Sequence, residues 1–391
     1  MKAIINGRII VPDDRGEFSL LEHGALIFDE KITEIREAQL EAAELASFDE
    51  IIDVAGDYVS PGFINVHLHG CAGFDTMDAS REAMEEICSF QAMTGVTAIC
   101  PTTMTNEFSK IERAFTAVAE AMKNPPRGAA VLGAHMEGPF ISKERCGAQP
   151  VDAIRKADFS LIERYTDVIR IITIAPEELE GDYRFIEKCR QSGIVVSLGH
   201  SSADYQTARK AITEYGATHV THLCNGMSPL HHRKPALAGA ALDTDADCEV
   251  IADNIHLHPM MQRLVMRMKQ GQHIILITDS LRACGQKGDD LISELGGQRV
   301  HVRGLLAVLD DGTIAGSVLT MDKGIANFAA NTGATIPQTV AFATKVPAEN
   351  LGIYDRIGSL EIGKQADITV FDSHIQIKYT FVNGEKVYSL E

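Results

Sequence analysis

The stretch SPGFINVHLHG, residues Ser60 to Gly70, places two imidazoles at the end of an apolar run that is typical of a buried β-strand. His67 and His69 are two positions apart, so their side chains would point to the same side of such a strand. Neutral imidazole is the commonest metal ligand among side chains at neutral pH. The pair therefore predicts half of a metal site whose other ligands come from elsewhere in the chain.

The composition favours a soluble globular enzyme or binding protein. The chain has 391 residues, of which 45% are hydrophobic, and no apolar run long enough to span a membrane. Its net charge of −18 argues against a nucleic-acid partner or an anionic membrane surface. The N-terminal MKAIINGRII lacks the apolar stretch of a signal peptide, and the eight cysteines form no CxxC pair, so we expect a reducing cytoplasm.

The two chain ends share a sequence pattern that the middle lacks. Residues 1–59 contain short β-rich runs broken by Gly, Asn and Asp, and residues 345–391 repeat this pattern with an NG turn. Terminal segments of the same kind can pair with each other. We therefore predict one discontinuous β-sandwich domain built from both ends.

Residues 60–344 alternate differently, with buried-type strands such as AICPTT, IVVSLGHSS and HIILITDS separated by helical stretches such as SREAMEEICSFQAMTG. This alternation recurs about eight times, which predicts a closed (β/α)8 barrel of the TIM type. Catalytic side chains in such barrels lie at the C-terminal ends of the strands.

Polar residues gather at those predicted strand ends. They are His67, His69, His135, Glu137, His200, His219, His222, His256 and Asp279. Any one of these histidines could be a capped loop residue or a core residue. Their convergence on one barrel rim instead predicts a metal and catalytic site.

The motifs PGFINVHLHG, GAHMEGPF, GHSSA, THLCNGM, IADNIHL, ITDS, AGSVLTM and GSLEIGKQADITVF resemble the amidohydrolase superfamily, and within it the N-acetylglucosamine-6-phosphate deacetylase family. The resemblance covers nearly the whole chain in the family's order. It implies a metal-bearing barrel with a small β-sandwich from both termini. The implied reaction hydrolyses the N-acetyl group of N-acetylglucosamine 6-phosphate to glucosamine 6-phosphate and acetate.

The same resemblance implies a divalent metal cofactor, with one or two ions per chain. Glu137, His200 and His222 would be the main ligands, and His67 with His69 would hold a second ion that Glu137 bridges. Nitrogen and carboxylate donors suit Zn²⁺ best, while Fe²⁺, Co²⁺ and Mn²⁺ fit as well.

Two further residues of the rim receive a role from the resemblance. Asp279 would contact the metal and shuttle the catalytic proton, although the TDS sequence could also cap a helix. His135 is expected to support the ligands or an oxyanion, or simply to pack.

The basic sequence HHRKP is unusual in so acidic a chain, and a sugar phosphate needs such a local charge. The resemblance implies phosphate contacts from Arg233 and His256, backbone donors at Asn225 and Gly226, and a homodimer that completes this phosphate site. The other expected substrate contacts are Ala148, Gln149, Asn254, Ile314, Ala315 and Gly316.

Three positions depart from the family pattern. Gln149 stands where the family has a sugar-contacting histidine, Asn254 replaces a glycine, and Gly226 replaces an alanine. The first two positions leave the identity of the sugar undetermined, so N-acetylgalactosamine 6-phosphate or another N-acyl hexosamine phosphate is an alternative substrate. A cyclic-amide hydrolase is disfavoured because HMEGP and Arg233 would have no role. A non-catalytic assembly protein would usually have lost ligands that this chain keeps.

Overall fold

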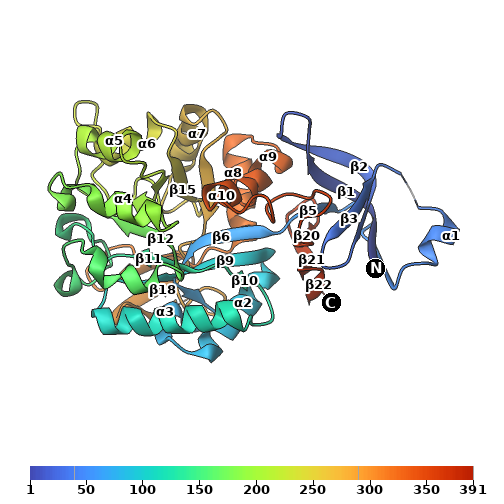
Figure 1. Ribbon diagram of the computed structural model, residues 1–391, viewed down its shortest axis with the longest axis horizontal. Coiled ribbons are helices and arrows are strands. Elements are labelled where there is room, and N and C mark those ends of the chain that lie inside the picture. Colours follow the sequence, from blue (N-terminus) through green and yellow to red (C-terminus); the bar gives the residue numbers. More distant parts are fainter. Residues whose placement is uncertain (39, 289, 391) are drawn as a thin grey trace.

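The computed structural model describes residues 1–38, 40–288 and 290–390, which form a barrel with a β-sheet at one side (Figure 1). The quoted stretch forms the first barrel strand, β6 (Phe63–Leu68), and every residue of β6 is buried. The chain then enters the alternation that the sequence predicts.

The barrel strands run parallel and follow chain order around the ring. They are β6, β9 (Val96–Thr103), β11 (Ala134–Glu137), β12 (Ile169–Ile174), β13 (Val195–Leu198), β14 (His219–Val220), β15 (Asp247–Ile251) and β16 (Ile274–Ile277), with β10 (Ala130–Val131) paired to β9 ahead of β11. Just beyond the end of β16, the Asp279 N–H donates to the carbonyl of His67, near the end of β6, at 2.9 Å. This contact completes the ring, and the predicted (β/α)8 barrel is confirmed.

Helices cover the outside of the barrel. They are α2 (Arg81–Met93), α3 (Phe108–Lys123), α4 (Arg184–Gln191), α5 (Tyr205–Thr213), α6 (Ala236–Leu242), α7 (Pro259–Met268) and α8 (Met321–Thr332). In α2, the N-cap Ser80 accepts from the Ala83 N–H, and Met84, Ile87 and Cys88 are buried at helical spacing. After β11 the 3-10 turns η4 (Phe159–Leu161) and η5 (Glu163–Tyr165) take the place of a longer helix.

Two short helices, α9 (Ile336–Ala341) and α10 (Lys345–Asn350), follow the last barrel helix. In one buried cluster, Ala348 of α10 packs with Ile64, Ile171 and Ile275 of the barrel strands. Each such buried aliphatic side chain contributes about 1.5 to 3 kcal/mol. This packing closes the barrel on the side away from the C-terminal strand ends.

The second sheet joins the two chain ends. Its order is β22 (Glu385–Ser389), β21 (Ile377–Val382), β20 (Ile368–Phe371), β5 (Tyr58–Pro61), β1 (Lys2–Pro12), β2 (Phe18–Phe28) and β3 (Ile32–Arg36), with β4 (Glu50–Asp53) on β1. The rings of Phe28 and Phe381 lie 5.4 Å apart, although three strands separate β2 from β21 in the sheet. The sheet therefore folds over its own core as a small sandwich, as predicted. The boundaries 1–59, 60–344 and 345–391 stay a prediction.

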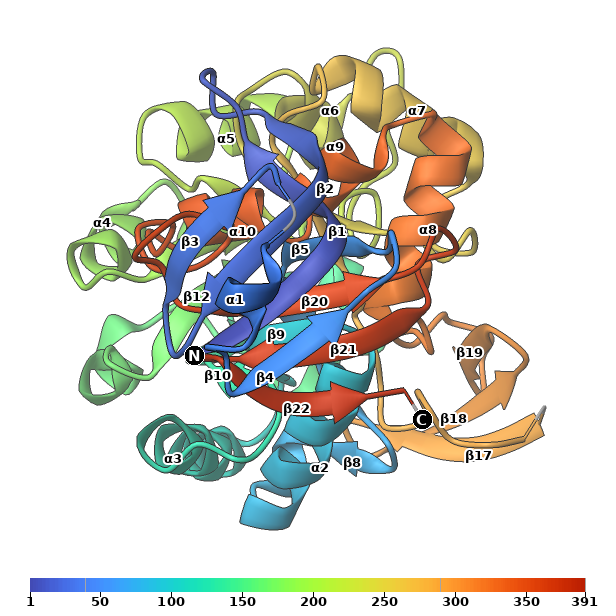
Figure 2. The ribbon, with the colours of Figure 1, turned by 90° about the vertical axis from the view of Figure 1, so that its right-hand side faces the viewer.

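Other short elements lie in the loops. They are α1 (Ala42–Leu45), β7 (Gly70–Cys71), β8 (Phe74–Asp75), η1 (Thr76–Asp78), η2 (Lys143–Arg145), η3 (Val151–Ala153) and η6 (Pro176–Leu179). An antiparallel sheet of β17 (Asp290–Leu295), β18 (Gln298–Arg303) and β19 (Leu306–Leu309) is inserted between β16 and α8 and projects from the barrel in Figure 2. This insertion was not predicted from the sequence.

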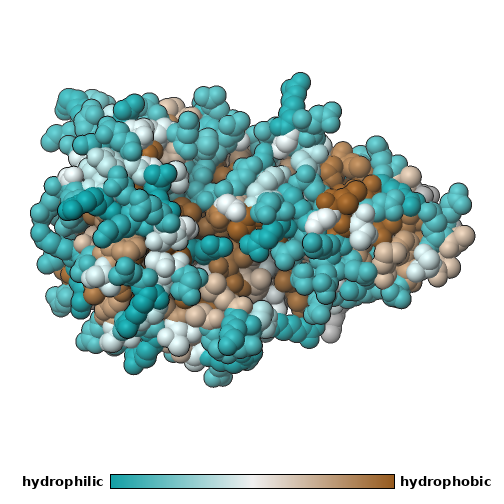
Figure 3. Space-filling model, viewed as in Figure 1, coloured by the Kyte–Doolittle hydropathy of each residue, from teal (hydrophilic) through white to brown (hydrophobic). Residues whose placement is uncertain are grey.

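The face of the molecule seen in Figure 3 is covered mainly by hydrophilic side chains, in line with the high net charge. Across residues 1–38, 40–288 and 290–390, no helix combines the length and apolar character that crossing a membrane requires.

Candidate metal centre and active site

Six side chains predicted as metal ligands meet at the C-terminal end of the barrel strands. They are His67 and His69 from the end of β6, Glu137 from the end of β11, and His200, His222 and Asp279 from the loops after β13, β14 and β16. None has more than 7% of its surface exposed. The structure thus brings together every predicted ligand.

The first ligand group comprises Glu137, His200 and His222. The Nε2 atoms of both histidines lie 3.1 Å from Oε1 of Glu137 and 3.1 Å from each other. Nδ1 of His200 faces the carbonyl of Arg145 at 2.9 Å, so it carries the proton of the neutral ring. A lone pair on Nε2 then faces a carboxylate oxygen, an arrangement that a cation between them would satisfy.

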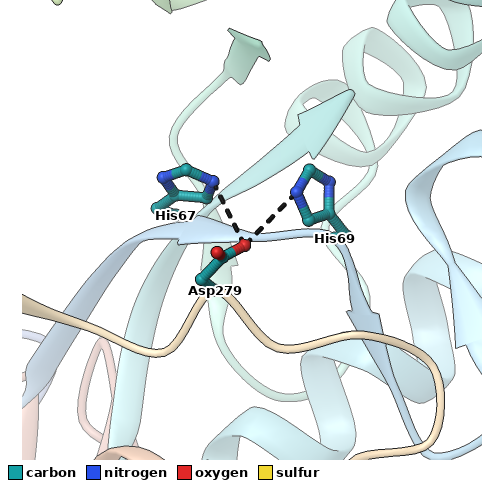
Figure 4. Close-up of side chains that lie close together, drawn as sticks. All are labelled: His67, His69 and Asp279. Atoms are coloured by element: carbon teal, nitrogen blue, oxygen red, sulfur yellow. Dashed lines mark ion pairs between the residues drawn. The ribbon is translucent and has the colours of Figure 1, made fainter. Parts of the chain in front are cut away.

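The second ligand group comprises His67, His69 and Asp279 (Figure 4). Oδ1 of Asp279 lies 3.4 Å from Nε2 of His67 and 3.3 Å from Nε2 of His69. Within the part of the chain that the structure describes, Nε2 of His67 and Oδ1 of Asp279 are buried and have no hydrogen-bond partner. Because orphaned buried polar atoms are rare and costly, a cation bound between these two atoms would satisfy both.

Glu137 connects the two ligand groups. Its Oε1 lies 3.5 Å from Nε2 of His67, and its Oε2 lies 3.2 Å from Nε2 of His69. Burial alone would raise the pKa of Glu137, but His67 and His200 outweigh that effect and hold the pKa well below its usual range. Glu137 is therefore an ionised carboxylate that faces ligands on both sides.

Backbone geometry aims three of these side chains into the barrel mouth. His200, His222 and Asp279 have φ values of +46°, +27° and +48°, in the region that residues other than glycine seldom adopt. Each such residue costs about 1 to 3 kcal/mol, which the surrounding fold must offset. Strain of this kind at three ligand positions is typical of a functional site.

A cavity of about 280 Å³ lies against the two ligand groups. Of the predicted residues, His69, Glu137, Ala148, Gln149, His200, His222, Asn225, Gly226, His256, Asp279, Ile314 and Gly316 line it. Met104, Gly147, Leu295 and Thr313 complete the lining and were not predicted. Ala315 is buried beside the lining residues, and His67 is fully buried next to the cavity.

Besides Ala315, two predicted substrate contacts lie outside this cavity. Arg233 stands in an exposed turn, where its guanidinium contacts Nε2 of His232 at 2.6 Å. Asn254 turns its side chain toward the helices, because Oδ1 accepts from Gln262 at 3.1 Å and from Asn331 at 2.6 Å. Within one chain, neither side chain reaches a ligand in the cavity.

Gln149 is placed differently from the expected sugar contact. Its amide N–H donates to Oε2 of Glu137 at 2.6 Å, and its carbonyl accepts from the Thr105 N–H at 2.7 Å. Only 4% of the residue is exposed. Both ends of the amide are thus engaged by the protein, and a sugar contact would have to replace one of these bonds.

His135 lies beneath the site rather than in the cavity lining. Its Nδ1 donates to the Val66 carbonyl at 3.0 Å, its Nε2 meets the Thr173 hydroxyl at 2.7 Å, and its ring packs 4.5 Å from that of His67. Burial and the neighbouring His67 lower the pKa of His135 to about 3, so the ring is neutral. This placement suits support of His67 and not contact with an oxyanion in the cavity.

Sequence reasoning missed Glu249, a fully buried carboxylate in the middle of β15. Its Oε2 lies 2.8 Å from Nδ1 of His67, and its Oε1 lies 3.0 Å from Nε2 of His219. The available signal was a glutamate inside the strand run CEVIAD, since an acid seldom sits in a buried strand unless it is paired.

Comparison with known proteins places the chain in a family. The sequence matches the Amidohydrolase family over residues 58–387. It is 39% identical over 343 residues to the N-acetylglucosamine-6-phosphate deacetylase of Bacillus subtilis (strain 168), an alignment that covers 86% of each chain. It is 33% identical over 334 residues to the N-acetylgalactosamine-6-phosphate deacetylase of Escherichia coli O157:H7, covering 84% of this chain and 87% of the other.

Solved structures show the same similarity. The N-acetylglucosamine-6-phosphate deacetylase of Pasteurella multocida superposes with a TM-score of 0.90 at 30% identity, over 100% of both chains. A mutant of the Mycobacterium smegmatis enzyme in complex with N-acetyl-D-glucosamine-6-phosphate gives 0.89 at 27% identity, over 99% of each chain.

Proposed function

The chain belongs to the amidohydrolase family, and we propose that it hydrolyses the N-acetyl group of N-acetylglucosamine 6-phosphate, releasing glucosamine 6-phosphate and acetate. The observation that carries the proposal is the meeting of two buried ligand groups at Glu137 beside one cavity. The resemblance of the chain to N-acetylglucosamine-6-phosphate deacetylases supports the phosphorylated amino sugar as its substrate.

The six ligand residues fit a divalent metal cofactor. Glu137, His200 and His222 would hold one ion, and His67, His69 and Asp279 would hold a second that shares Glu137. Nitrogen and carboxylate donors favour Zn²⁺, and Fe²⁺, Co²⁺ or Mn²⁺ would also bind. When bound, such an ion polarises an amide carbonyl and lowers the pKa of a coordinated water to about 7.

Asp279 is the residue that we assign to proton transfer. It is buried at the cavity wall, and its Oδ1 accepts no hydrogen bond from any residue that the structure describes. Burial would raise the pKa of Asp279, but the facing His67 and His69 lower it overall, so the carboxylate can accept a proton near neutral pH. Asp279 would take the proton from the attacking water and return it to the departing nitrogen.

The phosphate would be held by His256 and Arg233. His256 lines the cavity, and Asp253 fixes its ring through Nδ1 at 2.6 Å, which leaves Nε2 for a ligand. Arg233 lies in an exposed turn outside the cavity of its own chain. This position supports a homodimer in which the turn of one chain completes the phosphate site of the other. We also propose a cytoplasmic location, because the eight cysteines form no CxxC pair.

N-acetylgalactosamine 6-phosphate is the alternative substrate. A relative that acts on that sugar is 33% identical to this chain, and Gln149 replaces the histidine expected at the sugar. The two sugars differ in one hydroxyl configuration, which leaves the hydrolysis unchanged.

Acetate release from a panel of phosphorylated and free N-acetylhexosamines tests the proposal, with metal content measured on the same sample. We expect N-acetylglucosamine 6-phosphate to give the highest kcat/KM. A preference for N-acetylgalactosamine 6-phosphate would select the alternative, and no acetate from any of these sugars would contradict the proposed function.

A further inference from the structure

Glu249 is the residue least typical of a barrel interior, because its charged carboxylate is buried among four histidines. Its Oε2 faces Nδ1 of His67 at 2.8 Å and accepts from the backbone N–H of His222 at 2.9 Å. Its Oε1 faces Nε2 of His219 at 3.0 Å, and Nδ1 of His135 lies 3.9 Å away. One carboxylate therefore touches a member of each ligand group, His67 and His222, without itself lining the cavity.

The contact with Glu249 fixes the proton on His67. A carboxylate oxygen only accepts, so Nδ1 of His67 carries the hydrogen. The Nε2 lone pair then points away from Glu249, toward Oε1 of Glu137 at 3.5 Å and Oδ1 of Asp279 at 3.4 Å. Nε2 has no hydrogen-bond partner within the described residues, which is the state of a ring prepared to bind a cation.

Glu249 is itself anchored from the opposite side. Asn350 donates through Nδ2 to Asp247 at 2.7 Å, so its Oδ1 is the atom that meets Nδ1 of His219 at 2.8 Å. His219 thus donates at both nitrogens and carries a charge opposite to that of Glu249. Burial opposes this charge, but the hydrogen bond and charge of Glu249 raise the pKa of His219 overall.

This chain of contacts runs through the barrel from one end to the other. Asp247 begins β15 and lines a second cavity of about 760 Å³ at the N-terminal ends of the strands. The chain passes through Asn350 and His219 to Glu249, and ends at His67 beside the substrate cavity. Such a tether prevents Glu249 from rotating away from His67.

We propose that Glu249 is a positioning residue, which holds the His67 ring and the His222 backbone in the arrangement that a metal ion requires. The inference rests on the metal-dependent hydrolysis proposed above. Carboxylates behind metal-binding histidines fix the ring and raise its basicity, and their loss commonly costs about 10- to 100-fold in metal affinity. Glu249 acts on both ligand groups because its Oε2 accepts from both.

The test is a titration of chelator-stripped protein with Co²⁺, followed by visible absorption. Glu249→Leu, which removes both acceptors at similar volume, should weaken Co²⁺ binding about 10- to 100-fold. Glu249→Gln should recover most of this loss. Its amide oxygen can still accept from His67 and His222, while its NH2 group can face His219 once that ring gives up a proton.

A double-mutant cycle with His67→Asn separates positioning from a general structural role. The loss caused by Glu249→Leu should shrink several-fold in the His67→Asn background, because the ring to be positioned is gone. If Glu249→Leu does not fold, Glu249→Gln serves in the cycle. It should weaken Co²⁺ binding by about threefold or more with His67 present and have no effect without it.

Asp367→Asn is the matched control, because it also replaces a buried carboxylate by an amide but lies just before β20 of the terminal sheet, away from the barrel site. It should bind Co²⁺ like the parent. Co²⁺ affinity in Glu249→Leu equal to that of the parent, or a loss of the same size with and without His67, would overturn the inference. Acetate release by the parent enzyme, measured separately, tests the proposed function alone.

Discussion

The left-handed backbone at His200, His222 and Asp279 shows how much local strain this site contains. Asn254, which replaces a family glycine, has a φ of +68°, and asparagine is among the few residues that tolerate this region. The substitution therefore keeps the backbone path, while the Asn254 side chain accepts hydrogen bonds from Gln262 and Asn331 of the outer helices.

Asp279→Asn tests the proton transfer at this scale. Asparagine has nearly the same shape but cannot carry a proton between water and amine. We expect the variant to fold, to retain the metal ion held by Glu137, His200 and His222, and to lose about 10²- to 10⁴-fold in kcat. Kinetics of acetate release with metal analysis measures this, and a kcat within about threefold of the parent would place the proton transfer elsewhere.

Glu137→Gln and His67→Asn form a second comparison. Glu137 touches both ligand groups, whereas His67 belongs to one. Glu137→Gln should therefore lose more bound metal than His67→Asn. Elemental analysis of both purified variants decides this, and equal losses would argue against a shared Glu137.

The sequence alone predicted those site residues that stand in short sequence motifs. The spacing of His67 and His69 on a strand, and the strand-end positions of Glu137 and Asp279, were enough to place them together. The directions of Gln149 and Asn254 could not be predicted, because they depend on partners that are distant in sequence, such as Thr105 and Asn331.

At the scale of elements, the β17–β19 sheet shapes the site without carrying a ligand. Leu295 ends β17 and lines the cavity, and Thr313 and Ile314 follow β19. The pair Gly296–Gly297 between two β-rich runs is typical of a hairpin turn. This hairpin was not predicted because it lies within the stretch assigned to the alternating strands and helices of the barrel. Periodicity reports an element's type well, but it does not show whether the element belongs to the main sheet.

The turn between β21 and β22 permits a pH prediction. Asp367, just before β20, accepts from the Asn383 N–H at 2.7 Å, and burial raises the pKa of Asp367 to about 6. The folded chain then binds this proton more tightly than the unfolded chain, so stability falls as pH rises from about 4 to about 6 and stays lower above that.

Asp367→Asn should remove this penalty. We expect the variant to match the parent near pH 4 and to be more stable near pH 8, by at most about 3 kcal/mol. Denaturant unfolding at both pH values measures the difference. A variant that is less stable than the parent at pH 8 would show that the Asp367 charge contributes favourably.

At the scale of the whole molecule, two sequence patterns predicted the architecture. They are the alternation of strands and helices in the middle of the chain and the β-rich pattern that the two ends share. The closed barrel and the sandwich were predicted, but the contacts that form them, Asp279 with His67 and Phe28 with Phe381, could not be. Both depend on sheet twist and on packing between segments far apart in sequence.

Arg233 tests the proposed dimer. If its turn completes the phosphate site of a second chain, sedimentation should give a dimer. Arg233→Ala should then raise KM for the phosphorylated sugar about 10- to 150-fold, because a lost charge-assisted hydrogen bond costs about 1.5 to 3 kcal/mol. Turnover of the unphosphorylated sugar, which is slow, should stay unchanged. An equal effect of Arg233→Ala on both sugars would show that Arg233 is only a solvent-exposed loop residue.

Metal removal is the sharpest test of whether this chain is a metal-dependent deacetylase of a phosphorylated amino sugar. Acetate release from N-acetylglucosamine 6-phosphate should be lost when a chelator strips the protein, and should return on adding one or two equivalents of Zn²⁺ per chain. Undiminished acetate release from protein shown by elemental analysis to be free of metal would contradict the account.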